Sequence, residues 1–111
     1  MGLPAIGSVV VVLFPYADLS RLKSRPALVV GHAEFGNLIL CQITSQKSTS
    51  KTAIPLTAKD FSSGGLLLSS YVRPDKLSTL EDDLIIDKIG VLKQESLQNI
   101  LSKLQNLFSL K

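Results

Sequence analysis

Ser8–Phe14 reads SVVVVLF and is closed by Pro15. A short run of β-branched residues that ends at a proline is typical of a buried central strand. Two more apolar runs, Ala27–Val30 and Leu38–Ile43, follow it and are joined by a turn signal at His32–Asn37. Because no helical period separates the three runs, we expect neighbouring antiparallel strands rather than parallel strands linked by helices.

The middle of the chain continues in short segments. We interpret Thr52–Leu56 as a short strand that Pro55 marks as an edge or bulged strand, and Ser62–Gly65 as a loop. Tyr71–Leu80 is interpreted as a strand broken by Pro74, and Ile85–Leu92 as a final short strand or an extended segment around Gly90. A compact, strongly twisted antiparallel barrel is an economical way to bury so many short strands. No repeat or long linker divides the 111 residues, so we expect one domain over residues 1–111.

The apolar period changes near the C-terminus. Between Gln94 and Leu110 the apolar residues fall on one face of an α-helix, and they are Leu97, Ile100, Leu101, Leu104, Leu107 and Phe108. We expect this helix to pack on the barrel. A helix that binds a partner is the alternative interpretation.

The residue counts exclude several kinds of chemistry. The chain has one cysteine and one histidine, and 45% of its residues are apolar. Cys41 therefore cannot form an internal disulfide or a multi-thiolate zinc site, and we expect it in the core. His32 cannot supply a histidine pair for acid–base chemistry, so we expect a surface or hydrogen-bonding role. We interpret the acidic side chains of Glu81–Asp83 and Asp87 as a solvated surface and expect neither a metal nor a cofactor.

The chain also lacks the sequence signal of a membrane span. Its longest apolar run, Val9–Phe14, is far shorter than the ~20 residues that cross a bilayer. Ile6–Phe14 followed by Tyr16-Ala17 loosely resembles a secretory signal, but Met1–Ala5 carries no basic side chain. We therefore favour a buried strand, a cytoplasmic protein and no membrane partner.

The net charge of +3 is unevenly distributed. Residues 1–76 hold eight basic and four acidic side chains, whereas residues 77–111 hold four and five. A basic N-terminal region is compatible with a polyanionic partner.

Two polar connections in this basic region are candidate binding loops. Phe14–Pro26 reads FPYADLSRLKSRP and is long for a hairpin connection, and Gln46–Lys51 reads QKSTSK. Cationic side chains on loops contact phosphates and aromatic rings stack on bases, whereas plain solvated loops are the alternative. The candidate phosphate- and base-binding residues in and beside these loops are Phe14, Tyr16, Arg21, Lys23, Ser45, Gln46 and Lys47.

Arg25 differs from the other cations because Pro26 restricts it to an extended conformation directly before a predicted strand. A guanidinium fixed there can hold a phosphate or stabilise the charge of a phosphorane. Thr44 follows the third predicted strand, so antiparallel pairing through the His32–Asn37 turn brings it beside Arg25. This arginine–hydroxyl pair is a candidate catalytic site.

Arg73 and Asp75 flank Pro74 and form a second candidate. In an extended segment, side chains two positions apart share a face. The pair can engage a ribose–phosphate unit, with Asp75 as a general base. A surface ion pair that contributes little is the alternative interpretation.

Taken in order along nearly the whole chain, these segments resemble the MazF/PemK toxins, the ribosome-independent mRNA endonucleases of type II toxin–antitoxin systems. The resemblance rests on the valine-rich strand with FPYADLS at its end, on Lys23–Val30 (KSRPALVV), Gln42–Ser45, Ile54–Leu56, Asp60-Phe61, Gly64–Leu66, Ser70–Leu77 and Lys88–Gly90. It implies an SH3-like antiparallel barrel with a C-terminal α-helix, and a homodimer whose interface holds the RNA groove.

The resemblance also implies an activity, the sequence-specific and metal-independent cleavage of single-stranded mRNA. The ribose 2′-hydroxyl attacks the adjacent phosphate and leaves a 2′,3′-cyclic phosphate and a 5′-hydroxyl. The family's catalytic arginine falls on Arg25 and its strand-end threonine on Thr44. The arginine and aspartate of the PemK branch match Arg73 and Asp75 approximately, whereas that branch's loop histidine has no counterpart before Arg25.

The implied partners are single-stranded RNA, a cognate MazE-like antitoxin with an acidic tail, a second copy of the chain, and operator DNA reached only through the antitoxin complex. Leu66–Leu68 offers an apolar patch for the homodimer. Two alternatives are a non-catalytic toxin of the same barrel fold that binds a protein such as gyrase, and a member that only binds nucleic acid. The Arg25-Pro26 and Ile43–Ser45 motifs favour the nuclease, because a gyrase poison needs neither.

Overall fold

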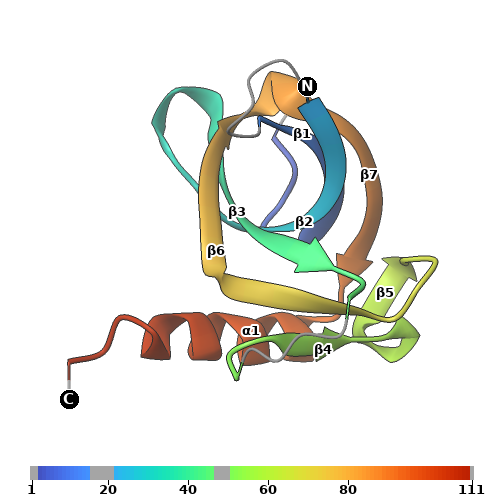
Figure 1. The fold of residues 1–111 in the computed structure, drawn as a ribbon, viewed down its shortest axis with the longest axis vertical. Coiled ribbons are helices and arrows are strands. Elements are labelled where there is room, and N and C mark those ends of the chain that lie inside the picture. Colours follow the sequence, from blue (N-terminus) through green and yellow to red (C-terminus); the bar gives the residue numbers. More distant parts are fainter. Residues whose placement is uncertain (1–2, 16–21, 47–50, 111) are drawn as a thin grey trace.

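The computed structural model describes residues 3–15, 22–46 and 51–110. In these residues seven strands form one antiparallel sheet in the order β4-β6-β3-β2-β1-β7-β5, and an α-helix follows them. The elements are β1 Ser8–Pro15, β2 Leu22–His32, β3 Asn37–Thr44, β4 Ile54–Leu56, β5 Phe61–Gly64, β6 Ser70–Glu81, β7 Ile85–Leu92 and α1 Gln94–Asn106. The sheet curls into an open barrel, and α1 runs along one end of it beside β4 and β5 (Figure 1). The predicted antiparallel barrel with a C-terminal helix is confirmed.

Alternate residues of the central strands enter two separate hydrophobic cores. Val9, Leu28 and Cys41 lie on one face of β1, β2 and β3, in one buried cluster with Leu97 and Ile100 of α1. The opposite face of the same strands forms the second cluster, which consists of Val10, Val12, Ala27, Val29, Leu38 and Leu40. The first strand is apolar without alternation because both of its faces are buried.

Asp60 fixes the start of α1 beside the connection between β4 and β5. One carboxylate oxygen accepts the Thr57 N–H at 2.8 Å, and the other accepts the Ser96 hydroxyl at 2.8 Å. The Asp60 carbonyl accepts the Lys93 N–H at 2.8 Å. These bonds orient the first turn of the helix so that its apolar face meets the sheet.

The loop predicted at Ser62–Gly65 is wrong, because Phe61–Gly64 forms β5 and pairs with β7. The glycines that suggested a loop instead allow two backbones to approach closely. Gly64 has a φ of 64°, and a Cβ there would lie 2.2 Å from the carbonyl oxygen of Ile89. Glycine is the residue that fits this conformation and this contact.

The predicted break at Pro74 is also wrong, because β6 runs without interruption through it. The pairing of β6 with β3 shifts between Gln42↔Arg73 and Cys41↔Leu77, so Pro74 lies in a bulge that has no partner on β3. A proline is tolerated there because no ladder hydrogen bond requires its missing N–H.

The second strand is longer than predicted, since β2 begins at Leu22 rather than at Ala27. Pairing with β1 extends it through Pro26, whereas the ladder to β3 begins only at Ala27. Lys23 and Arg25 therefore lie on a strand and not on the predicted flexible loop. The α-helix ends at Asn106 instead of Leu110.

The single cysteine and the single histidine lie where the sequence analysis expects them. Cys41 is fully buried in the core, and its burial, with Asp75 as a lesser cause, raises the pKa of the thiol to about 11. The exposed His32 lies with its Nε2 2.7 Å from the carbonyl oxygen of Pro4. Within the described residues, no helix combines the length and the apolar character that a bilayer crossing requires.

Candidate functional site

One face of the sheet carries a group of polar side chains where β3 ends. Thr44, the last residue of β3, pairs directly with Tyr71 of β6, and Gln42 pairs directly with Arg73. Directly paired residues of antiparallel strands point to the same face, as do residues two positions apart. Gln42, Thr44, Tyr71 and Arg73 therefore share one face, and each is half-buried.

Arg25 belongs to the same face. It lies two positions before Ala27, which pairs with Gln42 across the β2–β3 ladder. Continuing this register past the last paired residues places Arg25 opposite Thr44, at the same end of the two strands. On its other side, Arg25 pairs with the buried Val12 of β1. The structure thus brings together the arginine and the hydroxyl that the sequence analysis singled out.

Thr44 is held by the chain that follows it. The Gln46 N–H donates to the Thr44 hydroxyl oxygen at 3.2 Å. Because the oxygen is the acceptor in this bond, the hydroxyl proton points elsewhere and can donate to an anionic oxygen. Gln46 therefore contacts the site through its backbone.

Arg73 and Asp75 form a two-pronged ion pair on β6. Arg73 Nε donates to one carboxylate oxygen at 3.1 Å, and Nη2 donates to the other at 2.9 Å. The hydrogen bond from Arg73 is the largest cause of the lowered pKa of the Asp75 carboxyl. A carboxylate with a lowered pKa and both oxygens engaged is a poor proton acceptor, so the arrangement favours Asp75 as a group that orients Arg73.

Apart from Gln46, the predicted RNA-binding residues divide into three groups. Lys23 pairs with Phe14 and extends the face of Arg25 by one step towards the start of β2. Lys23 is exposed, whereas Phe14 also packs on the core. Ser45 lines a different, largely apolar cavity of about 500 Å³ with Val11, Pro26 and Leu66–Leu68. The structure therefore separates Ser45 from Thr44. Tyr16, Arg21 and Lys47 lie outside the described residues.

The sequence analysis missed two members of this face, Gln42 and Tyr71. Each is separated by a single residue from a predicted site residue on its own strand, so the alternation of an extended chain was the signal available. Alternation along one strand does not say which residues of two strands are neighbours, and the register between β3 and β6 gives this information. It shows that Tyr71 stands beside Thr44 and that Gln42 stands beside Arg73.

The fold and this face define a small antiparallel barrel protein with arginine and hydroxyl side chains gathered at one end of its sheet. The family model described as PemK-like, MazF-like toxin of type II toxin–antitoxin system matches residues 6–108. The chain belongs to this family. A comparison with curated proteins gives no significant match.

Solved structures of similar fold carry names from the same family. One is a MazE–MazF structure from Deinococcus radiodurans, with a TM-score of 0.77 and 22% identity over 99% of this chain and 100% of that chain. Another is an endoribonuclease in complex with its cognate antitoxin from a mycobacterial species, with a TM-score of 0.74 and 20% identity over 100% and 98%. The toxin MazF-mt6 of Mycobacterium tuberculosis has a TM-score of 0.72 and 19% identity over 94% and 98%.

Proposed function

We propose that this protein is a toxin of a type II toxin–antitoxin system that cleaves single-stranded mRNA at specific sequences. The observation that carries the proposal is the placement of Arg25 and Thr44 on one face, at the same end of two adjoining strands. Arg73 of the next strand lies on the same face. Family membership and relatives named endoribonucleases support this assignment.

The proposed reaction is an internal transfer within the RNA and uses no metal. The 2′-oxygen of a ribose forms a bond to the neighbouring phosphorus, and the bond from that phosphorus to the 5′-oxygen of the next nucleotide breaks. The 2′-hydroxyl loses a proton, and the leaving 5′-oxygen gains one. The products are a 2′,3′-cyclic phosphate and a 5′-hydroxyl.

The side chains of this face have distinct roles in the proposal. Arg25 stabilises the negative charge of the phosphorane and sits beside the leaving oxygen. Thr44 donates its hydroxyl proton to a phosphate oxygen. Arg73, oriented by Asp75, holds the phosphate with its remaining donors. Tyr71 offers a ring to the base next to the cleaved linkage.

The partners follow from the same assignment. We propose a homodimer, a cognate MazE-like antitoxin that blocks the RNA-binding face, and contact with operator DNA only within the antitoxin complex. Structures of relatives in complex with antitoxins support the antitoxin as a partner. A toxin that acts on mRNA works in the cytoplasm.

A cleavage assay tests the proposed function. Purified protein is incubated with a long single-stranded RNA in the presence of EDTA, and the new 3′ ends are analysed for a cyclic phosphate. We expect cleavage at short recurring sequences, and a loss of at least about 100-fold in kcat/KM for Arg25→Ala. Lys59→Ala, which alters an exposed lysine on the far connection between β4 and β5, is the matched control and keeps full activity.

Three results contradict parts of the proposal. RNA that is bound but not cleaved indicates a member that only binds nucleic acid. A strict requirement for magnesium overturns the metal-free reaction. Full activity in Arg25→Ala overturns the assignment of the site.

A further inference from the structure

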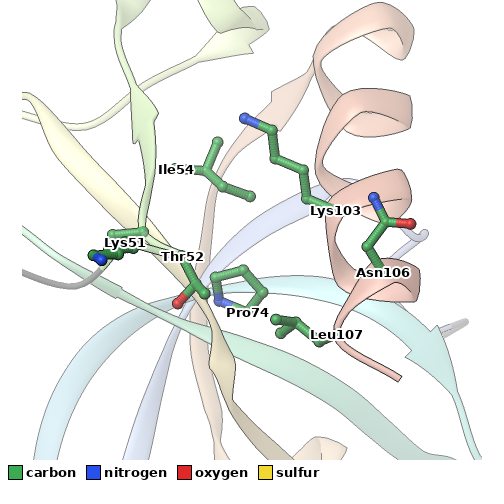
Figure 2. Close-up of a pocket in the computed structure, with 8 residues that line it drawn as sticks. Lys51, Thr52, Ile54, Pro74, Lys103, Asn106 and Leu107 are labelled. Carbon is green, nitrogen blue, oxygen red and sulfur yellow. The ribbon is translucent and has the colours of Figure 1, made fainter. Parts of the chain in front are cut away.

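A second hollow lies on the other side of β6, between the start of β4 and the end of α1. It has a volume of about 200 Å³ and is lined by residues from three places in the chain. Figure 2 shows Lys103 extending from α1 towards Ile54, Asn106 on the same helix, Pro74 near the centre, and Lys51 on the side opposite the helix. The sequence analysis placed Lys51 in a candidate binding loop and assigned no role to Lys103 or Asn106.

The walls are apolar and the rim is cationic. Ile54 and Pro74 are buried, and Leu107 is partly exposed at the mouth. In the described part of the chain, the one ion pair is that of Arg73 with Asp75, so neither Lys51 nor Lys103 has a carboxylate within 4.0 Å there. Two uncompensated ammonium groups around an apolar hollow suit a ligand that combines an anionic group with a flat apolar body.

The hollow adjoins the candidate site across β6. Pro74 stands between Arg73 and Asp75 on β6, with its side chain on the opposite face of the strand. The first residue of β4, Ile54, pairs with Val72, and the pairing goes no further along β6. Pro74 therefore has no partner on β4. An RNA strand bound at Arg73 therefore meets an unpaired edge of β6, and this edge leads to the hollow.

We propose that this hollow is a subsite for one nucleotide of the RNA, outside the cleaved linkage. This inference rests on the proposed function. The base lies against Leu107 at the mouth of the hollow, above the buried Pro74, and the Asn106 amide hydrogen-bonds to the base edge. Lys51 and Lys103 bind the phosphate. The volume is smaller than the roughly 300 Å³ of a typical small-molecule pocket, which limits the occupant to one base with its phosphate at the open rim.

Nucleotide titration of the full chain tests the subsite without relying on cleavage. The isotope-labelled protein is titrated separately with the four ribonucleoside 5′-monophosphates and with inorganic phosphate, and the amide signals are followed by NMR. We expect saturable shifts at Ala53, Ile54, Asn106 and Leu107. The double variant Lys51→Gln/Lys103→Gln should weaken this binding at least tenfold.

A matched pair of exposed lysines controls for net charge. Lys59→Gln/Lys93→Gln removes the same charge from positions that do not line the hollow and should leave the binding unchanged. Equal weakening by both double variants overturns the subsite. The absence of shifts in the hollow, or equal shifts with inorganic phosphate, overturns the nucleotide as its ligand.

The same proteins separate this inference from the proposed function. If the subsite contributes to RNA binding, Lys51→Gln/Lys103→Gln raises the KM for long RNA with little change in kcat. If the protein binds nucleotides in the hollow but cleaves no RNA, the proposed function is overturned and the nucleotide-binding site is still supported. Cleavage with an unchanged KM in this double variant overturns the subsite's role in RNA binding.

Discussion

Ser8 stands at the start of β1 with a fully buried hydroxyl that has no hydrogen-bond partner among the described residues. A buried hydroxyl without a partner costs free energy, because it has lost its bonds to water. We expect Ser8→Ala to raise the free energy of unfolding by about 1 kcal/mol, measured by urea denaturation. Ser70 is the matched control: it is also buried, but its hydroxyl donates to the Leu68 carbonyl at 2.9 Å. Ser70→Ala should lower stability by about 1 kcal/mol, and equal effects of the two variants would contradict this explanation.

The pH dependence of cleavage distinguishes two roles for Asp75, a group that orients Arg73 and a general base. The hydrogen bond from Arg73 lowers the pKa of the Asp75 carboxyl, so the ion pair is fully formed above the ordinary aspartate pKa and is lost as the pH falls through the lowered value. We expect Asp75→Asn to reduce RNA cleavage by no more than about 10-fold and to leave the shape of the kcat/KM profile unchanged from about pH 3 to pH 8, a range that extends below the ordinary pKa of aspartate. Loss of an acidic limb from the profile would instead identify Asp75 as the general base.

The candidate site shows which single residues can be predicted without a structure. Arg25 and Thr44 were paired by two local rules, the restriction that Pro26 imposes and antiparallel pairing through one turn. Tyr71 joins them through the register between β3 and β6, which depends on a bulge around Pro74. No local pattern in the sequence reports the size of that bulge.

At the scale of elements, the pairing of β5 with β7 depends on Gly64. An added methyl group would meet the Ile89 carbonyl oxygen at 2.2 Å, and the φ of 64° is unfavourable for other residues. We expect Gly64→Ala to lower the free energy of unfolding by about 2–4 kcal/mol. Gly65 is the neighbouring control, because a Cβ there meets nothing within 4 Å, so Gly65→Ala should change stability by less than about 0.5 kcal/mol. Thermal and urea unfolding of the two variants measure this difference, and equal losses would contradict the close-approach explanation.

The elements were predictable where the apolar pattern is strong and both neighbours are local. β7 has the predicted bounds, and β1, β3 and β4 differ from them by one or two residues. The predictions failed where tertiary contacts override a local signal. The glycines of β5 and the proline of β6 both suggest an interruption, yet each sits where a neighbouring strand requires or tolerates it. The length of β2 likewise comes from its pairing with β1, which extends the strand back through Lys23 to Leu22.

At the scale of the whole molecule, the fold was predictable because a chain of this length has few ways to bury short strands and an amphipathic helix. The two cores share the same central strands. The unbroken apolar run of β1, which has no polar–apolar alternation, already indicated a strand buried on both faces. The surfaces that meet other molecules are less apparent in the sequence. An exposed leucine and a core leucine contribute equally to an apolar pattern, and the structure is needed to tell Leu67 from Leu66.

The exposed leucines of the β5–β6 connection give the proposed homodimer a testable surface. Leu67 and Leu68 are 104% and 66% exposed and stand over the apolar cavity of about 500 Å³. Because they contribute little to the core, Leu67→Ser/Leu68→Ser should leave the fold intact while removing apolar contact area from an interface. We expect at least a tenfold weaker dimer in sedimentation velocity experiments.

Two other exposed apolar surfaces make this experiment decisive. Ile86→Ser on β7, where the side chain is 56% exposed, serves as the control and should leave the dimer unchanged. Phe108 and Leu110 follow α1 and are 67% and 101% exposed. Dissociation caused by Phe108→Ser/Leu110→Ser, with an unchanged dimer in the Leu67→Ser/Leu68→Ser variant, would move the interface to the end of the helix. That outcome would also place the partner copy beside Leu107 at the mouth of the nucleotide subsite, because Leu107 directly precedes Phe108 in the chain.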